Sequence, residues 1–362
     1  MCQKEYLLGE LKSKADKELN KFFNSEIKQA KKEEKPKEYL EMLKNLKAFT
    51  LNGGKRIRPI LFYYGYFIAG GKKEKDIFEA SISIELIHSY FLIHDDIIDE
   101  DDFRRHNLSM HRVYENESKK RQFRTLDEKA RKHFGISMAI IAGDLASSLG
   151  CEVLTCSNFL SDLKIKAVKK LNQVVLNTLT GEAMDVVLAD CLNVDLEDVF
   201  EMQRYKTAKY TFEGPLHLGA ILAGADEKFL KSISEFAIPL GIAFQIQDDI
   251  IGVFGNKKKT GKPVGADIKE GKKTLLTIKA FEKADGKQLK TLSMLFGNKD
   301  ISLKEVDNFR ELIKKTGSFE YSLEKINELI KFSKARLEKI KISKQNKECL
   351  LGLIDLMARR KY

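Results

Sequence analysis

The sequence is poor in residues that interrupt helices or cross-link small domains. Its 362 residues contain no tryptophan, five prolines and 23 glycines, which excludes a collagen-like or linker-rich chain. The five cysteines never form a C-x-x-C pair, so neither a zinc ribbon nor a disulfide scaffold is supported. A reducing compartment, the cytoplasm, is therefore expected.

Long hydrophobic runs are also missing. The most apolar stretches, residues 59–70 and 136–149, contain Gly65 and Asp144 respectively, and neither reaches the roughly 20 residues that span a bilayer. The first twenty residues are charged throughout, unlike a signal peptide. A soluble protein without a transmembrane segment is expected. With 43% hydrophobic and 32% charged residues, the chain has enough apolar material for a large core, which excludes global disorder.

The charge balance points to an anionic partner. The formal net charge is +11 at pH 7. Such a surplus is compatible with nucleic acid, a membrane surface or a phosphorylated metabolite, and by itself does not separate them.

Apolar periodicity predicts an all-α protein. Apolar residues recur at spacings of three and four from Ile82 to Ile97 and from Ile165 to Leu179, which is the period of a helix face. Residues 237–251 are apolar nearly all round, as in a buried central helix. No linker composition divides the chain, so residues 1–362 are predicted to form a single domain. Two polar segments stand apart: residues 26–38 are expected to be an exposed connection, and residues 114–132 a surface insertion or a solvated helix.

The first acidic segment is HDDIIDEDDFRR, residues 94–105. Asp95 and Asp99 share a helix face, and Asp96 lies one residue round. Carboxylates this close repel one another unless cations neutralise them, and hard oxygen ligands suit Mg²⁺ that is shared with substrate phosphates. The alternative is a solvated acidic helix end.

The second acidic segment, FQIQDDIIG, occupies residues 244–252. Asp248 and Asp249 lie in the most apolar predicted helix, and Gln245 is one turn before Asp249. Buried carboxylates need a metal, basic side chains or water. The alternative is a structural polar network. If the two acidic helices face each other, they form a multi-Mg²⁺ site for a diphosphate.

Basic residues accompany these acidic segments. Arg104 and Arg105 follow the first segment, and Lys262 and Lys272 follow the second. The sequence GGKRIRP, residues 53–59, places cations beside a pair of glycines. Arginine suits bidentate contact with phosphate, and lysine supplies a point charge.

Taken together, the motifs resemble the trans (E-type) polyprenyl diphosphate synthases. The resemblance covers roughly residues 40–290 and rests on seven motifs in order: GGKRIRP, HDDIIDEDDFRR, GISMAIIAGD, GEAMDV, KTAKYT, FQIQDDIIG and GKPVGADIKEGKKTLL. It implies an all-α isoprenoid synthase-type bundle around a deep central cavity, in a homodimer. It also implies condensation of an allylic diphosphate with isopentenyl diphosphate, giving farnesyl and/or geranylgeranyl diphosphate, with three Mg²⁺ ions per active site and no nucleic acid partner.

The resemblance also implies roles for individual residues. The first-motif Mg²⁺ ligands would be Asp95, Asp96 and Asp99, and the second-motif ligand Asp248, supported by Asp249. The allylic diphosphate clamp would be Arg104, Lys206, Lys262 and Lys272, with Thr207 and Gln245 near the developing cation. The isopentenyl diphosphate pocket would be Gly54, Lys55, Arg58, His88 and Arg105. The second motif departs from the DDxxD pattern, because Gly252 takes its last position; weakened metal support at most is expected.

Product length is expected to depend on Tyr90 and Phe91, which precede Asp95 by about one turn. A bulky ring there stops the growing chain. In the family pattern, aromatic residues at both positions favour the fifteen-carbon product.

Three other functions compete with this interpretation. A class I terpene cyclase shares the fold and first motif, but its N-D-x-x-S-x-x-x-E motif is not found here. A catalytically silent regulatory subunit is disfavoured by the intact acidic motifs. A helical nucleic-acid-binding protein would explain the net charge, but the basic residues are interspersed with acids.

Overall fold

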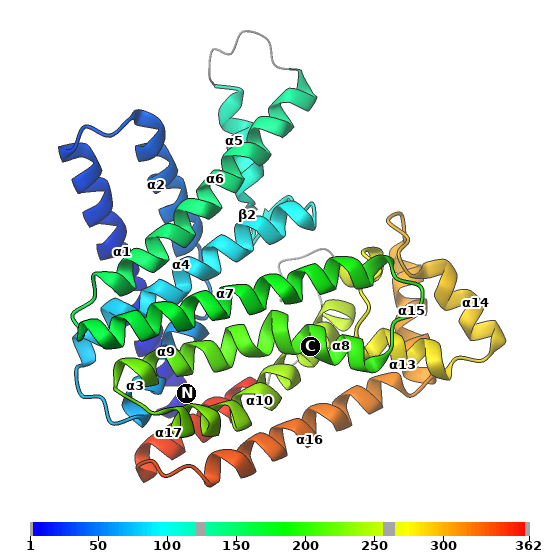
Figure 1. Ribbon diagram of the computed structural model, residues 1–362. Helices are drawn as coiled ribbons and strands as arrows, with labels where there is room; N and C mark the ends of the chain where they lie inside the picture. The colour runs from blue at the N-terminus through cyan, green and yellow to red at the C-terminus, as the bar shows by residue number, and fades with distance from the viewer. Residues whose placement is uncertain (1–2, 121–126, 256–264, 359–362) are drawn as a thin grey trace. The chain divides into compact units, whose positions relative to one another are not determined.

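The computed structural model describes residues 3–120, 127–255 and 265–358, and helices dominate these ranges (Figure 1). The elements run in this order: α1 Gln3–Lys32, α2 Lys37–Leu51, α3 Ile57–Ile68, α4 Glu74–Ile98, β1 Phe103–Arg104, β2 Asn107–Leu108, α5 Met110–Ser118, α6 Glu128–Thr155, α7 Ser161–Asp190, α8 Leu196–Gln203, the π-helix η1 Arg204–Glu213, α9 Gly214–Leu222, α10 Glu227–Phe254, α12 Ala266–Lys269, α13 Leu275–Lys283, α14 Gly286–Leu295, α15 Leu303–Lys315, α16 Ser318–Glu338 and α17 Lys344–Ala358. The predicted all-α class is confirmed.

Helix boundaries follow from local capping. Asp127 accepts a hydrogen bond from the backbone N–H of Ala130 and begins α6. Asp226 does the same for Phe229 at the start of α10. Ser302 and Glu305 form a reciprocal capping box at α15. Each cap satisfies backbone donors that the first helical turn leaves without intrahelical partners.

The chain divides into two compact units, which are described separately. The first comprises Met1–Leu171 and Ile221–Gly224. Helices α4 and α6 pack side by side in it (Figure 1). Its core contains Leu19 and Phe23 of α1, Leu46 of α2, Leu86 of α4 and Ala142 of α6.

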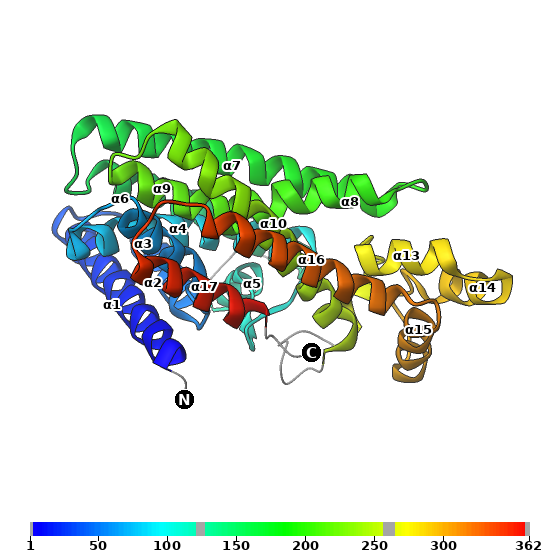
Figure 2. The same cartoon turned by 90° about the horizontal axis from the view of Figure 1, so that it is seen from below.

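The second unit comprises Asn172–Ala220 and Ala225–Tyr362. Helix α10 packs against α16 and η1 (Figure 2). Ile246 and Ile250 of α10 join Leu276 and Phe309 in its core. The predicted buried helix over residues 237–251 therefore lies at the centre of this unit. The single-domain interpretation stays a prediction.

The expected exposure of residues 26–38 is confirmed for residues 31–38, but the expected connection is wrong for most of the segment, which is helical. Helix α1 continues to Lys32, and α2 begins at Lys37 directly after Pro36. Ala30 is buried in the core of the first unit. The helix was not predicted because charged residues occupy its solvent-facing side and obscure its apolar periodicity.

The polar segment 114–132 is only partly solvated. Tyr114 and Ser118 of α5 are buried, so α5 is anchored in the core by its aromatic ring. Residues 121–126 lie outside the described residues, and α6 starts at Glu128. The expectation of a solvated segment is therefore corrected for Tyr114, Glu115 and Ser118, while Asn116 is exposed.

Two helices, α6 and α10, are long and apolar enough to cross a membrane by length and composition. More than half of the apolar window of α10 is buried inside the protein, as in the core helix of a soluble protein. The expected absence of a transmembrane segment stays a prediction.

Candidate active site

The first acidic segment lies at the C-terminal end of α4, in the first unit. Asp95 and Asp96 occupy its last turn, and Asp99 caps it. The β1–β2 hairpin then folds back and returns Arg104 to the helix end. The Arg104 Nε atom donates to Asp96 Oδ1 at 2.6 Å, and its Nη2 atom donates to Asp95 Oδ2 at 3.2 Å. Arg104 therefore offsets part of the negative charge of the acidic segment from the following hairpin.

Asp96 differs from its neighbours because its side chain is fully buried. Burial raises its pKa to about 6, although the charge of Arg104 acts in the opposite direction. Burial lowers the pKa of Arg104, but the carboxylates of Asp96 and Asp95 outweigh it, and the net shift is upward. Asp96 thus holds Arg104, while Asp95 and Asp99 remain partly accessible. The predicted ligand role of Asp96 stays a prediction.

The predicted isopentenyl diphosphate residues gather in the same unit, around the turn that joins α2 to α3. Lys55 is exposed and Arg58 is half-buried. Arg105 Nη1 donates to the backbone oxygens of Asn52 and Gly53, at 3.1 Å each. Gly54 adopts a φ of +99°, and a Cβ atom there would lie 3.0 Å from Arg105 Nη1. A glycine is needed there on both counts.

His88 lies beside the cationic side chains of this cluster. Burial lowers its pKa well below the usual value, and the charges of Arg58 and Arg105 add to the effect. The imidazole is therefore neutral near pH 7, and it can donate one hydrogen bond to an anion without adding charge.

The second acidic segment forms a buried network in the second unit. Gln203 Nε2 donates to Asp249 Oδ2 at 2.9 Å, and Gln245 Nε2 donates to Asp249 Oδ1 at 2.8 Å. Thr207 Oγ1 donates to Gln245 Oε1 at 2.6 Å. Burial raises the pKa of Asp249 to about 8. The hydrogen bond from Gln245 lowers this pKa, and the charges of Asp267 and Asp248 raise it further. Both Asp249 oxygens are committed to amides, and the adjacent Asp248 is half-buried.

Gln203 was missed by the sequence reasoning. It is fully buried and lies 46 residues before its partner. A lone glutamine at the end of a helix carries no signal in sequence.

Lys206 is held by α7. Its Nζ atom lies 2.8 Å from Glu182 Oε2 and 2.6 Å from Asp185 Oδ2. Lys206 and Thr207 both lie in the π-helix η1, and such helices are frequent at functional sites. Gly181 lets η1 approach α7, because a Cβ atom at this position would overlap the backbone of Lys206. The motif GEAMDV signalled Glu182 and Asp185, but the sequence alone gave them no role.

Asp267 explains the glycine in the second acidic motif. A Cβ atom on Gly252 would overlap the Asp267 carboxylate. A carboxylate from α12, fifteen residues later in the chain, therefore lies against the last position of the DDxxD pattern, and sequence reasoning missed it. Lys272 is close by in sequence and pairs with Glu270 at 2.9 Å. Lys262 lies outside the described residues.

Restoring an aspartate at position 252 is expected to impair the protein. The Gly252→Asp side chain would displace Asp267, and a displacement of about 1 Å in such a site can cost up to a hundredfold in rate. We expect turnover to fall by about tenfold. Steady-state kinetics would test this, with Gly286→Ala as control, because a Cβ atom on Gly286 meets no neighbour within 4 Å. Turnover equal to or above that of the unaltered chain would refute the assignment of Asp267.

The predicted chain-length residues lie on α4. Phe91 is buried, and Tyr90 is half-buried. The Tyr90 ring centroid lies 4.7 Å from those of both Phe91 and His94. The three rings therefore form one aromatic cluster directly before Asp95.

The donors near both acidic segments are carboxylate oxygens, which suit Mg²⁺. Within residues 3–120, 127–255 and 265–358, no three His, Cys, Asp or Glu side chains are arranged to hold a metal ion by themselves. The partly accessible carboxylates, Asp95 and Asp99 in the first unit and Asp248 in the second, are oxygen donors of the kind that suits an ion sharing its ligands with water and substrate oxygens.

Known families and solved structures include proteins similar to this chain. The Polyprenyl synthetase family model matches residues 40–313. The geranylgeranyl pyrophosphate synthase of Geoglobus acetivorans is 33% identical over 346 residues, 96% of this chain and 98% of its own length. The geranylgeranyl diphosphate synthase of Sulfolobus acidocaldarius is 34% identical, over 73% of this chain and 74% of that protein.

A solved structure extends the likeness to the fold. Geranylgeranyl pyrophosphate synthase from Corynebacterium glutamicum, complexed with isoprenyl diphosphate and magnesium, is 30% identical. Its TM-score is 0.90, with 98% of this chain and 99% of that chain covered. The motifs, the helical fold and these matches together show that the chain belongs to the polyprenyl synthetase family.

Proposed function

We propose that the protein is a short-chain trans-prenyltransferase that condenses an allylic diphosphate with isopentenyl diphosphate. The observation that supports it most is the presence of two distinct cationic groups in the first unit. Arg104 stands against the acidic segment, whereas Lys55, Arg58, Arg105 and neutral His88 gather at the turn between α2 and α3. Two diphosphate substrates need two such groups, whereas a terpene cyclase binds one diphosphate.

The reaction begins with rupture of the allylic C–O bond. Arg104, Lys206 and Lys272 would stabilise the charge that develops on the departing diphosphate. We propose that three Mg²⁺ ions bind here. Asp95, Asp99 and Asp248 would hold them, and the ions would neutralise further charge on the diphosphate. Lys55, Arg58 and Arg105 would hold isopentenyl diphosphate, whose double bond attacks the allylic cation. Loss of a proton then restores an alkene.

The hydroxyl of Thr207 and the amide of Gln245 would lie near the developing cation. Their mutual hydrogen bond and the bond from Gln245 to Asp249 fix their orientation. Oriented dipoles of this kind stabilise charge without reorganising during the reaction.

Incubation with Mg²⁺ and isopentenyl diphosphate, together with each of dimethylallyl, geranyl and farnesyl diphosphate in turn, tests the proposal. We expect chain-extended diphosphates and release of pyrophosphate only when both substrates are present. A hydrocarbon formed from farnesyl diphosphate alone would indicate a cyclase. No turnover with any primer would favour the regulatory subunit.

We propose a product of fifteen or twenty carbons. The relatives named above are geranylgeranyl synthases, while aromatic residues at both positions 90 and 91 favour the shorter product. Tyr90→Ala and Phe91→Ala are each expected to lengthen the main product by at least one five-carbon unit, because each removes a ring from the aromatic cluster. Product chromatography measures this. The exposed Phe332→Ala serves as control, and unchanged chain lengths in both variants would contradict the assignment.

We propose that the protein is a cytoplasmic homodimer. Helix α7 exposes Leu176, Leu179, Val186 and Val187. Exposed apolar side chains that recur along one helix are typical of interaction sites, and a second copy of the chain would offer the same apolar surface. Sedimentation equilibrium that returned one chain mass at micromolar concentration would contradict the dimer.

A further inference from the structure

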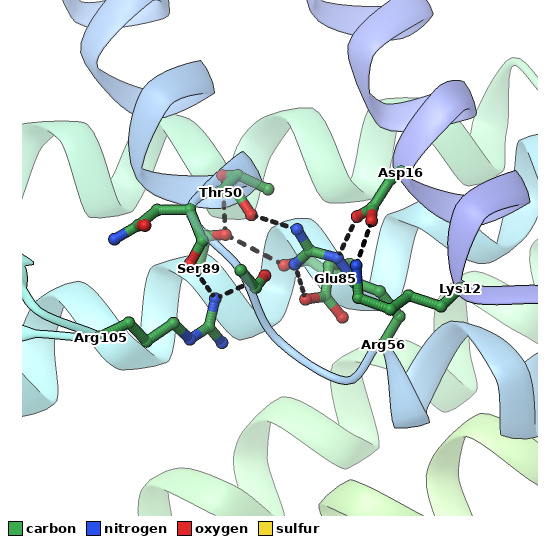
Figure 3. A network of polar contacts seen from close by, with 9 residues as sticks. Lys12, Asp16, Thr50, Arg56, Glu85, Ser89 and Arg105 are labelled. Carbon is green, nitrogen blue, oxygen red and sulfur yellow. Dashed lines mark hydrogen bonds and ion pairs between the residues drawn. The ribbon is translucent and has the colours of Figure 1, made fainter. Parts of the chain in front are cut away.

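The buried arginine of GGKRIRP has a different environment from its two basic neighbours. Lys55 is exposed and Arg58 is half-buried, but Arg56 is only 3% exposed. Its Nε atom donates to Asp16 Oδ1 at 2.6 Å, Nη1 to Glu85 Oε1 at 2.5 Å, and Nη2 to the Thr50 backbone oxygen at 2.7 Å (Figure 3). One guanidinium thereby joins α1, α2 and α4 at a single point.

The backbone conformation of Arg56 shows that its three hydrogen bonds do more than pack helices together. Arg56 directly precedes α3 and has a φ of +53°, in the left-handed region. This conformation is unfavourable for a residue with a Cβ atom, so the surrounding structure must hold it. The three hydrogen bonds fix the guanidinium, and they thereby fix the turn that carries Lys55 and the start of α3, where Arg58 lies.

The same network extends to Arg105. Ser89 Oγ lies 2.8 Å from Thr50 Oγ1 and also donates to the Glu85 backbone oxygen at 3.2 Å. Arg105 donates to the backbone oxygens of Asn52 and Gly53, in the same turn (Figure 3). The turn is therefore held by Arg56 through the Thr50 backbone oxygen and by Arg105 through the backbone oxygens of Asn52 and Gly53.

We propose that Arg56 is a positioning residue for isopentenyl diphosphate, and that it acts through Asp16 and Glu85. Anchored to these two carboxylates, it sets the turn so that Lys55, Arg58 and Arg105 converge on one diphosphate. The inference rests on the proposed function. It gives α1 a part in substrate binding, although Asp16 precedes the residues that match the family model, 40–313.

The decisive variant is Arg56→Lys. Lysine keeps the charge but lacks the planar fork that reaches three acceptors on three helices. We expect the KM for isopentenyl diphosphate to rise by about tenfold and the KM for the allylic diphosphate to stay within about twofold, because a misplaced turn disturbs one substrate only. Asp16→Asn should shift the same KM in the same direction, by about threefold, and Asp16→Glu should restore most of it.

A control separates positioning from general stability. Lys21 of α1 pairs with Glu79 of α4 at 2.9 Å, on the exposed side of the same two helices. Lys21→Met removes a tether between α1 and α4 without touching the turn, and both KM values should stay unchanged. If Arg56→Lys does not fold, Asp16→Asn carries the test alone.

The outcomes distinguish the two claims. Equal changes in both KM values, or a lower melting temperature with neither KM altered, would overturn the positioning role of Arg56. Failure of the unaltered chain to consume isopentenyl diphosphate with any primer would instead overturn the proposed function. A selective loss for isopentenyl diphosphate, restored in Asp16→Glu, supports the inference.

Discussion

Replacement of Asp95 or Asp248 by alanine is expected to lower turnover by roughly two to three orders of magnitude, while the helical fold persists. Both carboxylates are partly accessible beside an acidic neighbour that is buried and already engaged, Asp96 and Asp249 respectively. They are therefore the oxygens best placed to bind metal in each unit. Loss of electrostatic stabilisation at a departing group typically costs this much in rate.

Turnover at saturating Mg²⁺, together with circular dichroism, would test the two variants. The exposed Asp300→Ala provides the control, because it removes a carboxylate that belongs to neither acidic segment. A further comparison is Asp249→Ala, which should also reduce stability because it leaves the amides of Gln203 and Gln245 without their acceptor. Near-normal turnover in Asp95→Ala or Asp248→Ala would remove that residue from the site.

Local patterns were sufficient to predict the helices that carry the site. The spacing of Ile82, Leu86 and Ile93 predicted α4, and all three are buried. The stripe on α7 was less informative: Leu171 is buried, but Ile165 and Leu179 are exposed. Periodicity reveals the apolar face of a helix. It cannot distinguish a face that packs against the core from one that is exposed in the single chain.

Contacts between distant segments could not be predicted from the sequence. Arg56 looks like a third surface cation of GGKRIRP in the sequence, because its partner Asp16 lies 40 residues earlier, among many other charged residues of α1. In the sequence, Gly252 looks like a missing carboxylate of the metal motif. The structure shows that the Asp267 carboxylate lies beside it. The hairpin that returns Arg104 was also hidden, since its two loop residues, Arg105 and His106, have positive φ angles without being glycine or asparagine.

Replacement of Arg104 by methionine is expected to cost about 3–5 kcal/mol of folding stability, because it leaves the buried Asp96 carboxylate without its partner. Activity should be lost as well, since Arg104 belongs to the proposed diphosphate clamp. The exposed Arg204→Met, which breaks the pair with Glu201, is the control and should be near neutral. Chemical denaturation in the presence of a chelator measures the difference.

The pH dependence of the stability loss in Arg104→Met identifies the cause of that loss. The pKa of Asp96 is raised to about 6 in the folded protein. As the pH rises, Asp96 therefore loses its proton in the unfolded chain before it does so in the folded protein. The free energy of unfolding consequently falls between about pH 4 and the folded pKa. Arg104 opposes that shift, and its removal would raise the folded pKa further and extend the loss to higher pH. The stability deficit of Arg104→Met should therefore be larger at pH 8 than at pH 5. A deficit independent of pH would mean that lost packing around the arginine stem, and not the unpaired carboxylate, destabilises the variant.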